Sequence, residues 1–435
     1  MRSDRAQPDV AIVGGGFSGT MTAVHLARRG LAVCLIEGAD RIGRGVAYST
    51  TEAAHLLNVP AAKMSAWPDK PADFADWLAD DGGSFAERRQ FGRYLGAILD
   101  AAEGVERIGS GCVSAERNGS GWVLRLDDGR EVAASVMVLA NGNQPPAAMA
   151  VAAGLRPELF VNNPWTASAA SALARAVEED GDVLILGTGL TMIDTVLSLD
   201  AARHRGRIVA LSRRGQIPRA HAPNEASSVG ADELPTGNAL ALCRWLRRRG
   251  GEVGWRSAVD SLRPHSQALW QAFSTAEKRR FLRHARPWWD VHRHRIAPQV
   301  AQRIASLVAE GRLQIVAGRI ASLAEQDGQI AASIVRRGRG EAVSERFALA
   351  VNCTGPLGEI KRTADPLLRQ LLGDQTIAVD ELGMGLNVDS GDRAGDRLWA
   401  VGPMTKGRYW EIVAVPDIRG QAAAVAETIQ RELGK

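Results

Sequence analysis

Three closely spaced glycines near the N-terminus could hold the phosphates of a dinucleotide. Gly14, Gly16 and Gly19 form the pattern GxGxxG. The first glycine of this pattern permits a tight turn, the second lets the backbone approach a pyrophosphate, and the third lets a helix lie close to a strand. Phe17 and Ser18 lie within this loop, and the helix that follows it would present free N–H groups and the positive end of its dipole to the phosphates.

An acidic residue completes this unit. The loop follows an apolar run at 10–13 and precedes a helical pattern at 20–29, and a second apolar run at 32–36 leads to Glu37. A carboxylate at the end of the second strand can accept a hydrogen bond from a ribose 2′-hydroxyl and would repel a 2′-phosphate. The order strand, loop, helix, strand and acid predicts a βαβ unit that binds a dinucleotide. A chance glycine turn is the simpler alternative.

A second loop of the same kind occurs in mid-chain. Gly187 and Gly189 follow another apolar run, and Leu190 and Thr191 begin the next helical pattern. Met192 takes the place of the third glycine. We therefore expect either a wider spacing between helix and strand or a methionine packed into the gap.

The strand expected after this second loop ends in arginines rather than in an acid. The apolar run 208–211 leads through Ser212 to Arg213 and Arg214. Guanidinium groups at this position can pair with a 2′-phosphate through two parallel hydrogen bonds. This favours NADPH, with NADH as the alternative cofactor. The alternative interpretations are that these arginines are only solvated or that the domain is vestigial and binds no cofactor.

The elements that must position these loops follow from hydrophobic periodicity. Helical patterns cover 88–103, 239–249, 266–273, 276–285, 298–310 and 418–432, and strand patterns cover 111–140, 183–186, 313–335, 347–353 and 398–401. Strands that alternate with helices indicate parallel sheets. The predicted fold class is therefore α/β, with two Rossmann-like dinucleotide-binding domains.

Composition and charge argue against several other classes of protein. The formal net charge is only +4, which is too small to indicate nucleic-acid binding by itself. The four cysteines form no CxxC pair, so we expect no dithiol redox centre. The histidines lack the spacing of a zinc site, so no metal is expected. With no signal-peptide pattern and no long apolar run, we expect no membrane span and a cytoplasmic location.

The chain resembles the flavoproteins that carry two dinucleotide-binding domains, most closely the bacterial members described only as FAD/NAD(P)-binding proteins. The segments that carry the resemblance are 42–48, 55–61, 163–165, 283–284, 293–295, 410–412 and 415–419. In architecture this group is related to the flavin-dependent N-hydroxylating monooxygenases. The resemblance spans nearly the whole chain; it is specific for cofactors and says little about the substrate.

The resemblance implies a division of the chain. FAD would bind a discontinuous domain made of residues 1–160 and 341–435. NADP, as NADPH, would bind the domain at 161–340, which carries a helical insertion at about 235–300. The expected partner is a small-molecule substrate, with a second copy of the chain as a further option.

The resemblance also implies positions around the cofactors. Gly142 follows the third strand of the FAD domain, in Ala-Asn-Gly where relatives have Ala-Thr-Gly. Gly402 matches a late glycine near the flavin, but Pro403 stands where many relatives have an aspartate. Val113 lies on the strand whose backbone meets the adenine. An ordinary loop glycine or core valine is the alternative at each position.

Four residues are expected to line or border the flavin and substrate cleft: Asn58, His221, Arg408 and Trp410. Polar side chains there could donate hydrogen bonds to a flavin that becomes anionic on reduction. Core packing for Trp410 and a plain loop position for His221 are the alternatives.

A segment rich in arginine and tryptophan has three readings. Arg279, Arg283 and Arg286 recur at i, i+4 and i+7, and the run 292–295 alternates histidine and arginine. Such residues on one helix face could form a cationic pocket for an anionic substrate. They could also be solvated or paired with acids, or could contact nucleic acid.

Two kinds of flavin chemistry remain open. The first is an NADPH-dependent monooxygenase, for which an arginine-rich pocket would suit an amino-acid-like substrate; the FxGxxxHxxxW fingerprint of ketone and sulfur oxygenases is missing, and 162–165 is at most a fragment of it. The second is a reductase that passes electrons to a small acceptor or a protein, without a dithiol. A redox-sensing binding module is a third, non-enzymatic option.

Overall fold

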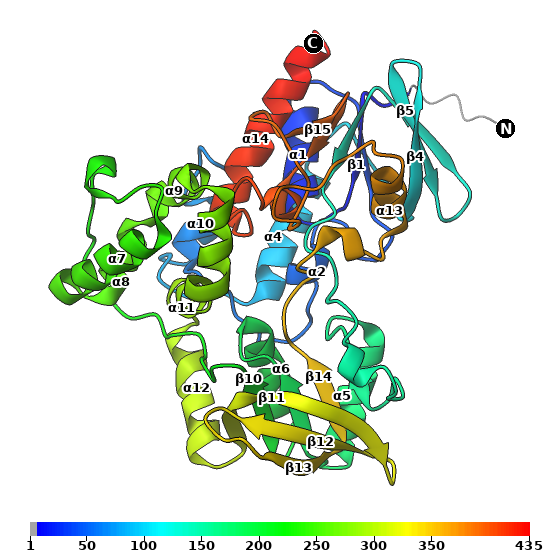
Figure 1. Ribbon diagram of the computed structural model, residues 1–435. Helices are drawn as coiled ribbons and strands as arrows, with labels where there is room; N and C mark the ends of the chain where they lie inside the picture. Colours follow the sequence, from blue (N-terminus) through cyan, green and yellow to red (C-terminus); the bar gives the residue numbers. More distant parts are fainter. Residues whose placement is uncertain (1–6) are drawn as a thin grey trace.

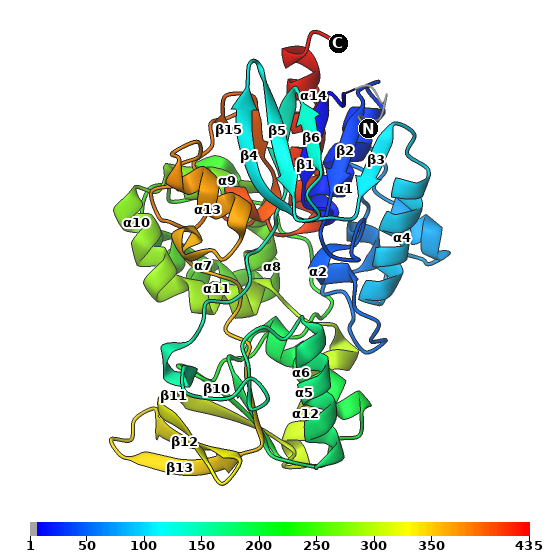
Figure 2. The same ribbon diagram turned by 90° about the vertical axis from the view of Figure 1, so that its right-hand side faces the viewer.

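Each glycine loop follows a strand of its own parallel sheet, and the two sheets form the cores of two lobes (Figures 1 and 2). The computed structural model describes residues 7–435. The first sheet contains, in spatial order, β15 (Arg393–Gly395), β16 (Leu398–Ala400), β7 (Val136–Leu139), β1 (Val10–Val13), β2 (Val33–Ile36) and β3 (Val105–Ile108). Because β16 and β15 come from near the C-terminus, the first lobe is built from two separate parts of the chain.

Alternate residues of β1 face two different cores, as the pleat of a strand requires. Val10 and Ile12 point to a core shared with three helices, and Ala11 and Val13 point to a second core. The helices on the first face are α1 (Phe17–Ala27), α4 (Arg88–Asp100) and α14 (Val415–Glu432). The opposite face is covered by α13 (Pro366–Gly373) and by a sheet of β4 (Cys112–Asn118), β5 (Gly121–Leu126) and β6 (Glu131–Ala134). Burial on both faces explains why β1 is apolar throughout.

The second sheet repeats this plan. Its spatial order is β13 (Ala342–Phe347), β12 (Gln329–Arg336), β11 (Leu313–Gln326), β10 (Ile208–Ser212), β9 (Val183–Leu186), β14 (Leu349–Asn352) and β8 (Phe160–Val161). Helices α5 (Ala167–Glu178), α6 (Leu190–Ala201) and α12 (Pro298–Ala309) pack on one face. Strands β11, β12 and β13 pair antiparallel at the edge.

The boundary between the lobes lies later than the sequence suggested. We expected the second part of the first domain to begin at residue 341, but β13 and β14 belong to the second sheet. Val351 of β14 pairs with Val161 of β8 and with Ile185 of β9. The apolar run at 347–353 contains β14, which is buried along its whole length between β9 and β8, so residues 341–352 stay with the second lobe.

The helical insertion lies beside both lobes (Figure 1). It comprises α7 (Ala239–Val253), α8 (Trp255–Ser261), α9 (Ser266–Ala272), α10 (Thr275–Arg280) and α11 (Arg286–Arg293). The helix expected at 276–285 is interrupted by a π-helical turn, η5 (Phe281–Ala285). Pro287 lies in the first turn of α11 and cannot donate a backbone hydrogen bond, which accounts for the change of helix type before it. Arg279, Arg283 and Arg286 therefore lie on three successive helical segments rather than on the single helix that the spacing suggested.

Remaining short helices complete the chain. They are α2 (Gly45–Tyr48), α3 (Asp73–Leu78) and the 3₁₀ turns η1 (Ala61–Lys63), η2 (Ala150–Ala152), η3 (Ala231–Glu233), η4 (Arg263–His265), η6 (Ile360–Arg362) and η7 (Gly402–Thr405). Of these, η1 and η7 border the sites described below.

Candidate functional site

The first glycine loop packs so tightly that two of its positions exclude any side chain. Gly14 has a φ of +109°, and a Cβ there would lie 2.3 Å from the carbonyl oxygen of Ala140. A Cβ on Gly19 would lie 1.9 Å from the carbonyl oxygen of Gly14. The first glycine therefore makes the turn and the third brings α1 against the strand, as the sequence pattern implies.

The N-terminus of α1 is available to an anion. Within residues 7–435 no side chain caps the helix at Gly16, so the N–H groups of Phe17 and Ser18 point out of the loop without an intrahelical acceptor. The carboxylate of Glu37 lies beside the same loop. Its Oε2 accepts a hydrogen bond from the backbone N–H of Gly15 at 3.0 Å. This arrangement fits a dinucleotide whose phosphates meet the helix and whose ribose meets the acid.

Two further glycines line the same end of the first sheet. Gly402 follows β16 with a φ of +72°, and a Cβ there would lie 2.2 Å from Oγ of Ser18. Gly142 follows β7 with a φ of +66° and has open space where a Cβ would be. The preceding Asn141 donates from Nδ2 to Asp365 at 3.1 Å, while its buried Oδ1 has no hydrogen-bond partner in the described part of the chain. A buried acceptor without a partner and the open space beside Gly142 both fit a bound cofactor.

The second loop reproduces the geometry of the first. Gly187 has a φ of +114°, and a Cβ there would lie 2.2 Å from the carbonyl oxygen of Cys353. Cys353 follows β14 as Ala140 follows β7, so the two lobes place their first loop glycine against equivalent strands. Gly189 begins α6, whose N-terminus has no side-chain cap within the described residues. Met192 is fully buried in the core under the loop, which is the packed arrangement we considered.

Polar side chains surround the end of β10. Thr188 donates from Oγ1 to Oγ of Ser212 at 2.8 Å, and Ser212 accepts from the backbone of Gly215 at 3.0 Å. Arg213 is exposed and Arg214 is half-buried. For residues 7–435, neither guanidinium forms an ion pair with a carboxylate. Both charges are therefore free to meet a phosphate at this edge of the second sheet.

The structure brings two of the four expected reaction-centre residues together. Nε2 of His221 lies 3.0 Å from the carbonyl oxygen of Asn58, so the chain after the arginines of the second lobe meets the loop before η1 of the first. The ring of His221 also lies 5.0 Å from that of Phe85. Burial is the main cause that lowers the pKa of His221.

The other two expected residues lie elsewhere. Trp410 stacks on Trp270 with a centroid distance of 5.0 Å and meets Phe281 edge-on at 5.4 Å. Trp270 in turn donates from Nε1 to the carbonyl of Gly407 at 2.9 Å. This cluster packs the helical insertion against the C-terminal segment. Trp410 is half-buried, and its place at the border of a cleft stays a prediction.

Arg408 lies shortly after η7 (Gly402–Thr405) in the chain. Its guanidinium carbon lies 5.6 Å from the ring centre of Tyr409, and its buried Nε has no hydrogen-bond partner in residues 7–435. Val113, expected near the adenine, lies on β4 of the three-stranded sheet. These two positions stay predictions.

Two buried contacts join the lobes. Nη1 of Arg88, at the start of α4, lies 2.9 Å from Oδ2 of Asp194 on α6. Nε2 of His55 lies 2.9 Å from Oγ of Ser198 on the same helix. Only 5% of Asp194 and 4% of His55 is exposed. A buried charge needs a partner, so this ion pair fixes one helix of each lobe against the other.

Most charges of the arginine-rich segment are paired with acids. Arg293 donates to Glu411 at 2.9 Å, and Trp289 donates to the other oxygen of the same carboxylate at 2.7 Å. Arg295 contacts Asp260 at 2.6 Å. The reading of this segment as acid-paired therefore holds for Arg293 and Arg295, and the cationic pocket is formed by other residues.

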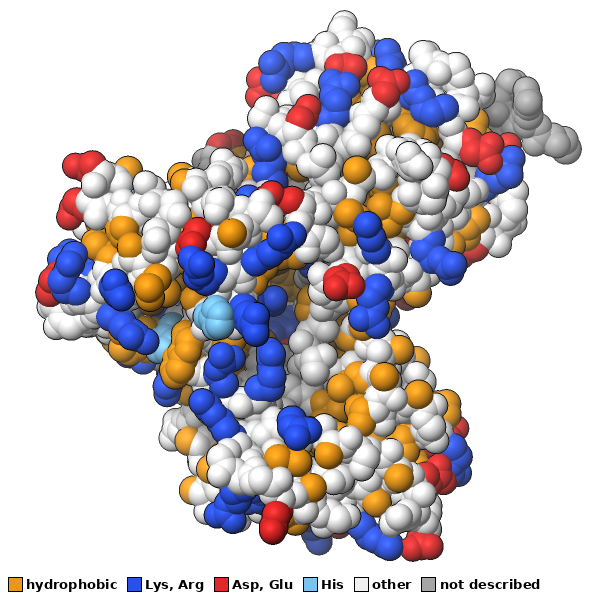
Figure 3. Space-filling view, viewed as in Figure 1, with side chains coloured by type: hydrophobic (Ala, Val, Ile, Leu, Met, Phe, Trp, Pro, Cys, Tyr) orange, Lys and Arg blue, Asp and Glu red, His pale blue; other side chains and the backbone are white. Residues whose placement is uncertain are grey.

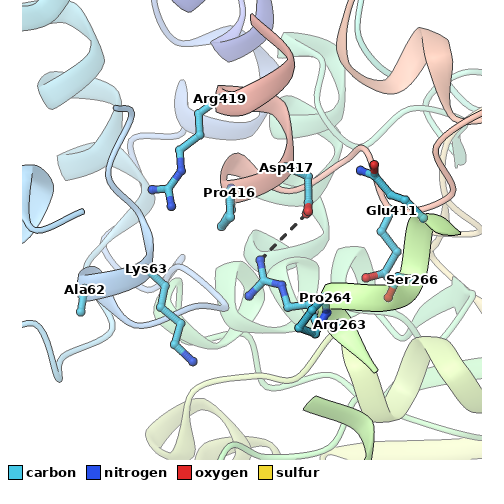
Figure 4. Close-up of a pocket in the computed structure, with 10 residues that line it drawn as sticks. Ala62, Lys63, Arg263, Pro264, Ser266, Glu411, Pro416, Asp417 and Arg419 are labelled. Atoms are coloured by element: carbon cyan, nitrogen blue, oxygen red, sulfur yellow. Dashed lines mark ion pairs between the residues drawn. The ribbon is translucent and has the colours of Figure 1, made fainter. Parts of the chain in front are cut away.

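A pocket of about 520 Å³ lies beside this segment (Figure 4). Lys63 from η1, Arg263 from η4 and Arg419 from α14 converge on it from three parts of the chain. Asp417 lies across from Arg263, with 3.9 Å between Nη2 and Oδ2. Burial is the main cause that lowers the pKa of Arg263 and raises the pKa of Asp417.

Sequence reasoning missed this pocket. Lys63 and Arg419 lie in or next to segments that carry the family resemblance, at 55–61 and 415–419, and Arg263 precedes the basic segment. Lys63, Arg263 and Arg419 are far apart in the sequence and form no local pattern. Only the fold identifies them as neighbours.

Positive charge also gathers around the hollow between the lobes. Figure 3 shows Lys, Arg and His side chains crowded beside α10 and α11 and facing this hollow. Such a surface attracts anions such as nucleotides. For the chain from residue 7 onward, no group of three His, Cys, Asp or Glu side chains could hold a metal ion, and no helix is long and apolar enough to cross a membrane.

Comparisons with known proteins agree with this architecture. Residues 11–144 match a family model described as FAD-NAD(P)-binding. An FAD-binding monooxygenase, acrE of Aspergillus aculeatus, is 29% identical over 143 residues, which are 32% of this chain. The chain spans only 23% of the length of that relative.

Two solved structures have the same fold along nearly the whole chain. The L-lysine 6-monooxygenase of Pseudomonas syringae has a TM-score of 0.70 at 19% identity, covering 98% of this chain and 99% of that one. The ornithine N-hydroxylase of Kutzneria sp. 744, in complex with reduced FAD, NADP+ and L-ornithine, has a TM-score of 0.69 at 15% identity, covering 98% of this chain and 100% of that one. The predicted fold class, with two dinucleotide-binding domains, is thereby confirmed.

Proposed function

We propose that this protein is an FAD-dependent oxidoreductase that uses NADPH and acts as a monooxygenase on a small anionic, amino-acid-like substrate. The observation that carries the proposal is the duplicated loop geometry. Gly14 against Ala140 and Gly187 against Cys353 make two phosphate cradles, one in each lobe. A single-cofactor dehydrogenase needs only one such cradle.

The residues of each lobe suit the two cofactors differently. Glu37 favours free ribose hydroxyls at the first loop, as in FAD, whereas Arg213 and Arg214 favour a 2′-phosphate at the second, as in NADPH. FAD bound there would supply hydride acceptance from NADPH and the activation of dioxygen. The buried pair of Arg88 and Asp194 would hold the two cofactors in a fixed relative position.

The pocket that contains Lys63, Arg263 and Arg419 is the proposed substrate site. Its cations can bind a carboxylate. Oδ2 of Asp417, which lies 3.9 Å from Nη2 of Arg263, is buried and has no hydrogen-bond partner among residues 7–435, so it can accept an N–H of the substrate. A pocket that offers both cations and a carboxylate suits a small molecule that carries one negative and one positive group. The relatives with this fold that act on lysine and ornithine support an amino-acid-like substrate.

A reductase that passes electrons to a small acceptor or a partner protein without a dithiol is the alternative, and a reductase that works through a thiol is disfavoured. Burial raises the pKa of Cys34, Cys112 and Cys353 to about 12, so these thiols stay protonated. Cys243 is half-buried, and burial raises its pKa as well. A thiolate is the nucleophile in disulfide exchange, so this set of cysteines suits no such reaction.

The proposal is tested with the purified protein and added FAD. We expect a yellow protein that oxidises NADPH and releases hydrogen peroxide when no substrate is present. The correct amino-acid-like substrate should lower peroxide release and yield an oxygenated product by mass spectrometry. A protein that binds no FAD, or that reduces dyes but never couples NADPH oxidation to any product, would contradict it.

The substrate pocket is tested separately. Replacing Lys63 or Arg263 by Met should raise KM for the substrate about tenfold or more, as expected for a lost charge-assisted hydrogen bond. FAD content and NADPH oxidation without substrate should not change. Lys70→Met is the matched control, because Lys70 is an exposed lysine of the same loop region outside this pocket. An equal effect of all three replacements would remove the assignment.

A further inference from the structure

The turn at Gly402 is held by a closed ring of hydrogen bonds. Its backbone N–H donates to Oε1 of Gln421 at 2.7 Å, and its carbonyl accepts from Oγ1 of Thr405 at 2.9 Å. Gln421 closes the ring by donating from Nε2 to Oγ1 of Thr405 at 3.0 Å. Both backbone groups of Gly402 are thus bound by side chains, although turns are normally satisfied by their own backbone or by water.

A buried carboxylate fixes the orientation of the amide. Nε2 of Gln421 also donates to Oδ1 of Asp392 at 2.8 Å. Because the amide nitrogen then has two acceptors, its oxygen must face Gly402, and a flipped amide would place a donor against a donor. The three side chains are buried, and Thr405 has no exposed surface at all.

The backbone of Asp392 has a conformation that is unfavourable for a residue with a side chain. Its φ is +63°, in the left-handed region that favours glycine. An aspartate kept in that conformation and buried away from water needs a compensating interaction. The hydrogen bond to Gln421 is such an interaction. It indicates that this position requires the carboxylate, because glycine would make the same turn without strain.

The ring lies next to the first cofactor cradle. Gly402 touches Ser18 at the N-terminus of α1, where a Cβ would come within 2.2 Å of Oγ. Strands β16, β7 and β1 are parallel, so Gly402, Gly142 and Gly14 follow strands that end at the same edge of the sheet. A shift of the Gly402 turn would therefore change the shape of the cradle directly.

We infer that Gln421, oriented by Asp392 and Thr405, is the positioning residue that holds the Gly402 turn against FAD, an inference that rests on the proposed function. Pro403, the residue after Gly402, has neither a polar side chain nor a backbone N–H that could hold the turn. Gln421, from α14, supplies the polar anchor from below the turn instead of from within it. Its contribution is to the position of the backbone, not to direct contact with the cofactor.

The test compares apo-protein variants by titration with FAD. Gln421→Leu should weaken FAD binding about tenfold, the effect of losing a buried hydrogen bond, and should shift the visible absorption maxima of the bound flavin. Asp392→Gly removes the carboxylate without backbone strain, because glycine accepts a positive φ. It should weaken binding about threefold or more, whereas Asp392→Asn, which keeps an acceptor for Gln421, should restore both affinity and spectrum.

Two further variants complete the experiment. Thr405→Val removes the hydroxyl with little change of shape and should resemble Asp392→Gly, which keeps the test decisive if Gln421→Leu does not fold. Gln430→Leu is the control, because Gln430 is a half-buried glutamine farther along α14. Thermal melting of the apo-proteins separates positioning from general loss of stability.

The outcomes distinguish this inference from the proposed function. If wild-type protein takes up no FAD, the proposed function fails and the inference fails with it. If wild-type protein binds FAD but Gln421→Leu, Asp392→Gly and Thr405→Val bind it with unchanged affinity and spectrum, the positioning role alone is overturned.

Discussion

His221 and Asn58, which are 163 residues apart, are joined by a hydrogen bond of 3.0 Å between Nε2 of the imidazole and the backbone carbonyl oxygen. A carbonyl can only accept, so Nε2 carries the proton, and Nδ1 is the unprotonated nitrogen of the neutral ring. The backbone N–H of His221 donates to Ile296 at 2.9 Å, which fixes the segment that holds the ring. The contact ties the chain after Arg213 and Arg214 to the loop that leads into η1.

Replacing His221 by phenylalanine should remove the hydrogen bond to Asn58 without leaving a cavity in place of the ring. His221→Phe keeps the ring packing on Phe85 but leaves the carbonyl of Asn58 without its donor, at a cost of about 1–3 kcal/mol in the free energy of unfolding. Denaturant titration measures it. His284→Phe, at an exposed histidine, is the control and should change little; equal losses would contradict the role of the hydrogen bond.

The same histidine should give a defined pH dependence. Because burial lowers its pKa in the folded protein, the unfolded chain binds more protons below its ordinary value of 6.5. The stability that neutral His221 contributes is present above that pH and is lost as the pH falls. Wild-type protein should therefore lose more stability than His221→Phe between about pH 7 and pH 5. Parallel losses would show that other groups govern acid unfolding.

The ion pair of Arg88 and Asp194 should be stabilising only as a pair. Arg88→Leu leaves a buried carboxylate uncompensated and should cost about 3–5 kcal/mol. Arg88→Leu combined with Asp194→Leu should recover most of this loss, which a double-mutant cycle measures. Arg89→Leu, which breaks the more exposed pair with Glu87, is the control and should cost less than about 1 kcal/mol.

The arginines at the end of β10 should select the nicotinamide cofactor. Arg213→Ala with Arg214→Ala should raise KM for NADPH markedly, since each charge-assisted phosphate contact contributes about 1.5–3 kcal/mol. KM for NADH should change little. Arg205→Ala is the control, because this exposed arginine precedes β10 at the opposite end of the strand. Equal effects on both cofactors would remove the assignment.

The buried carboxylate of Asp392 should make the protein less stable as the pH rises. Burial, as the largest cause, raises its pKa from 3.8 to about 6, so the folded state holds a proton that the unfolded chain releases. Wild-type protein therefore loses stability between about pH 4 and pH 6, relative to Asp392→Asn, which does not titrate. Thermal melting at several pH values measures the difference between the two proteins. A difference that stays constant with pH would contradict the raised pKa.

The sequence by itself determined the loops that hold phosphates and the class of the fold. Gly14, Gly19 and Gly187 are required by backbone geometry within a few residues of each loop, so the requirement appears in the local pattern. The strands β1 and β9 could also be predicted from the sequence, because a strand buried on both faces is a continuous apolar run.

Only the tertiary structure decided which side chains meet. Charge is visible in the sequence, but Arg293 and Arg295 are paired with Glu411 and Asp260, whereas Lys63 and Arg263 face the open pocket.

The same holds for the predicted reaction-centre residues and for the turn at Gly402. Trp410 stacks on Trp270 because the helical insertion folds onto the C-terminal segment, and Gln421 meets Gly402 only because α14 crosses below the sheet edge. Local backbone conformation depends on neighbours in the chain, whereas the partner of a long side chain depends on how distant elements pack, and no short-range pattern encodes that packing.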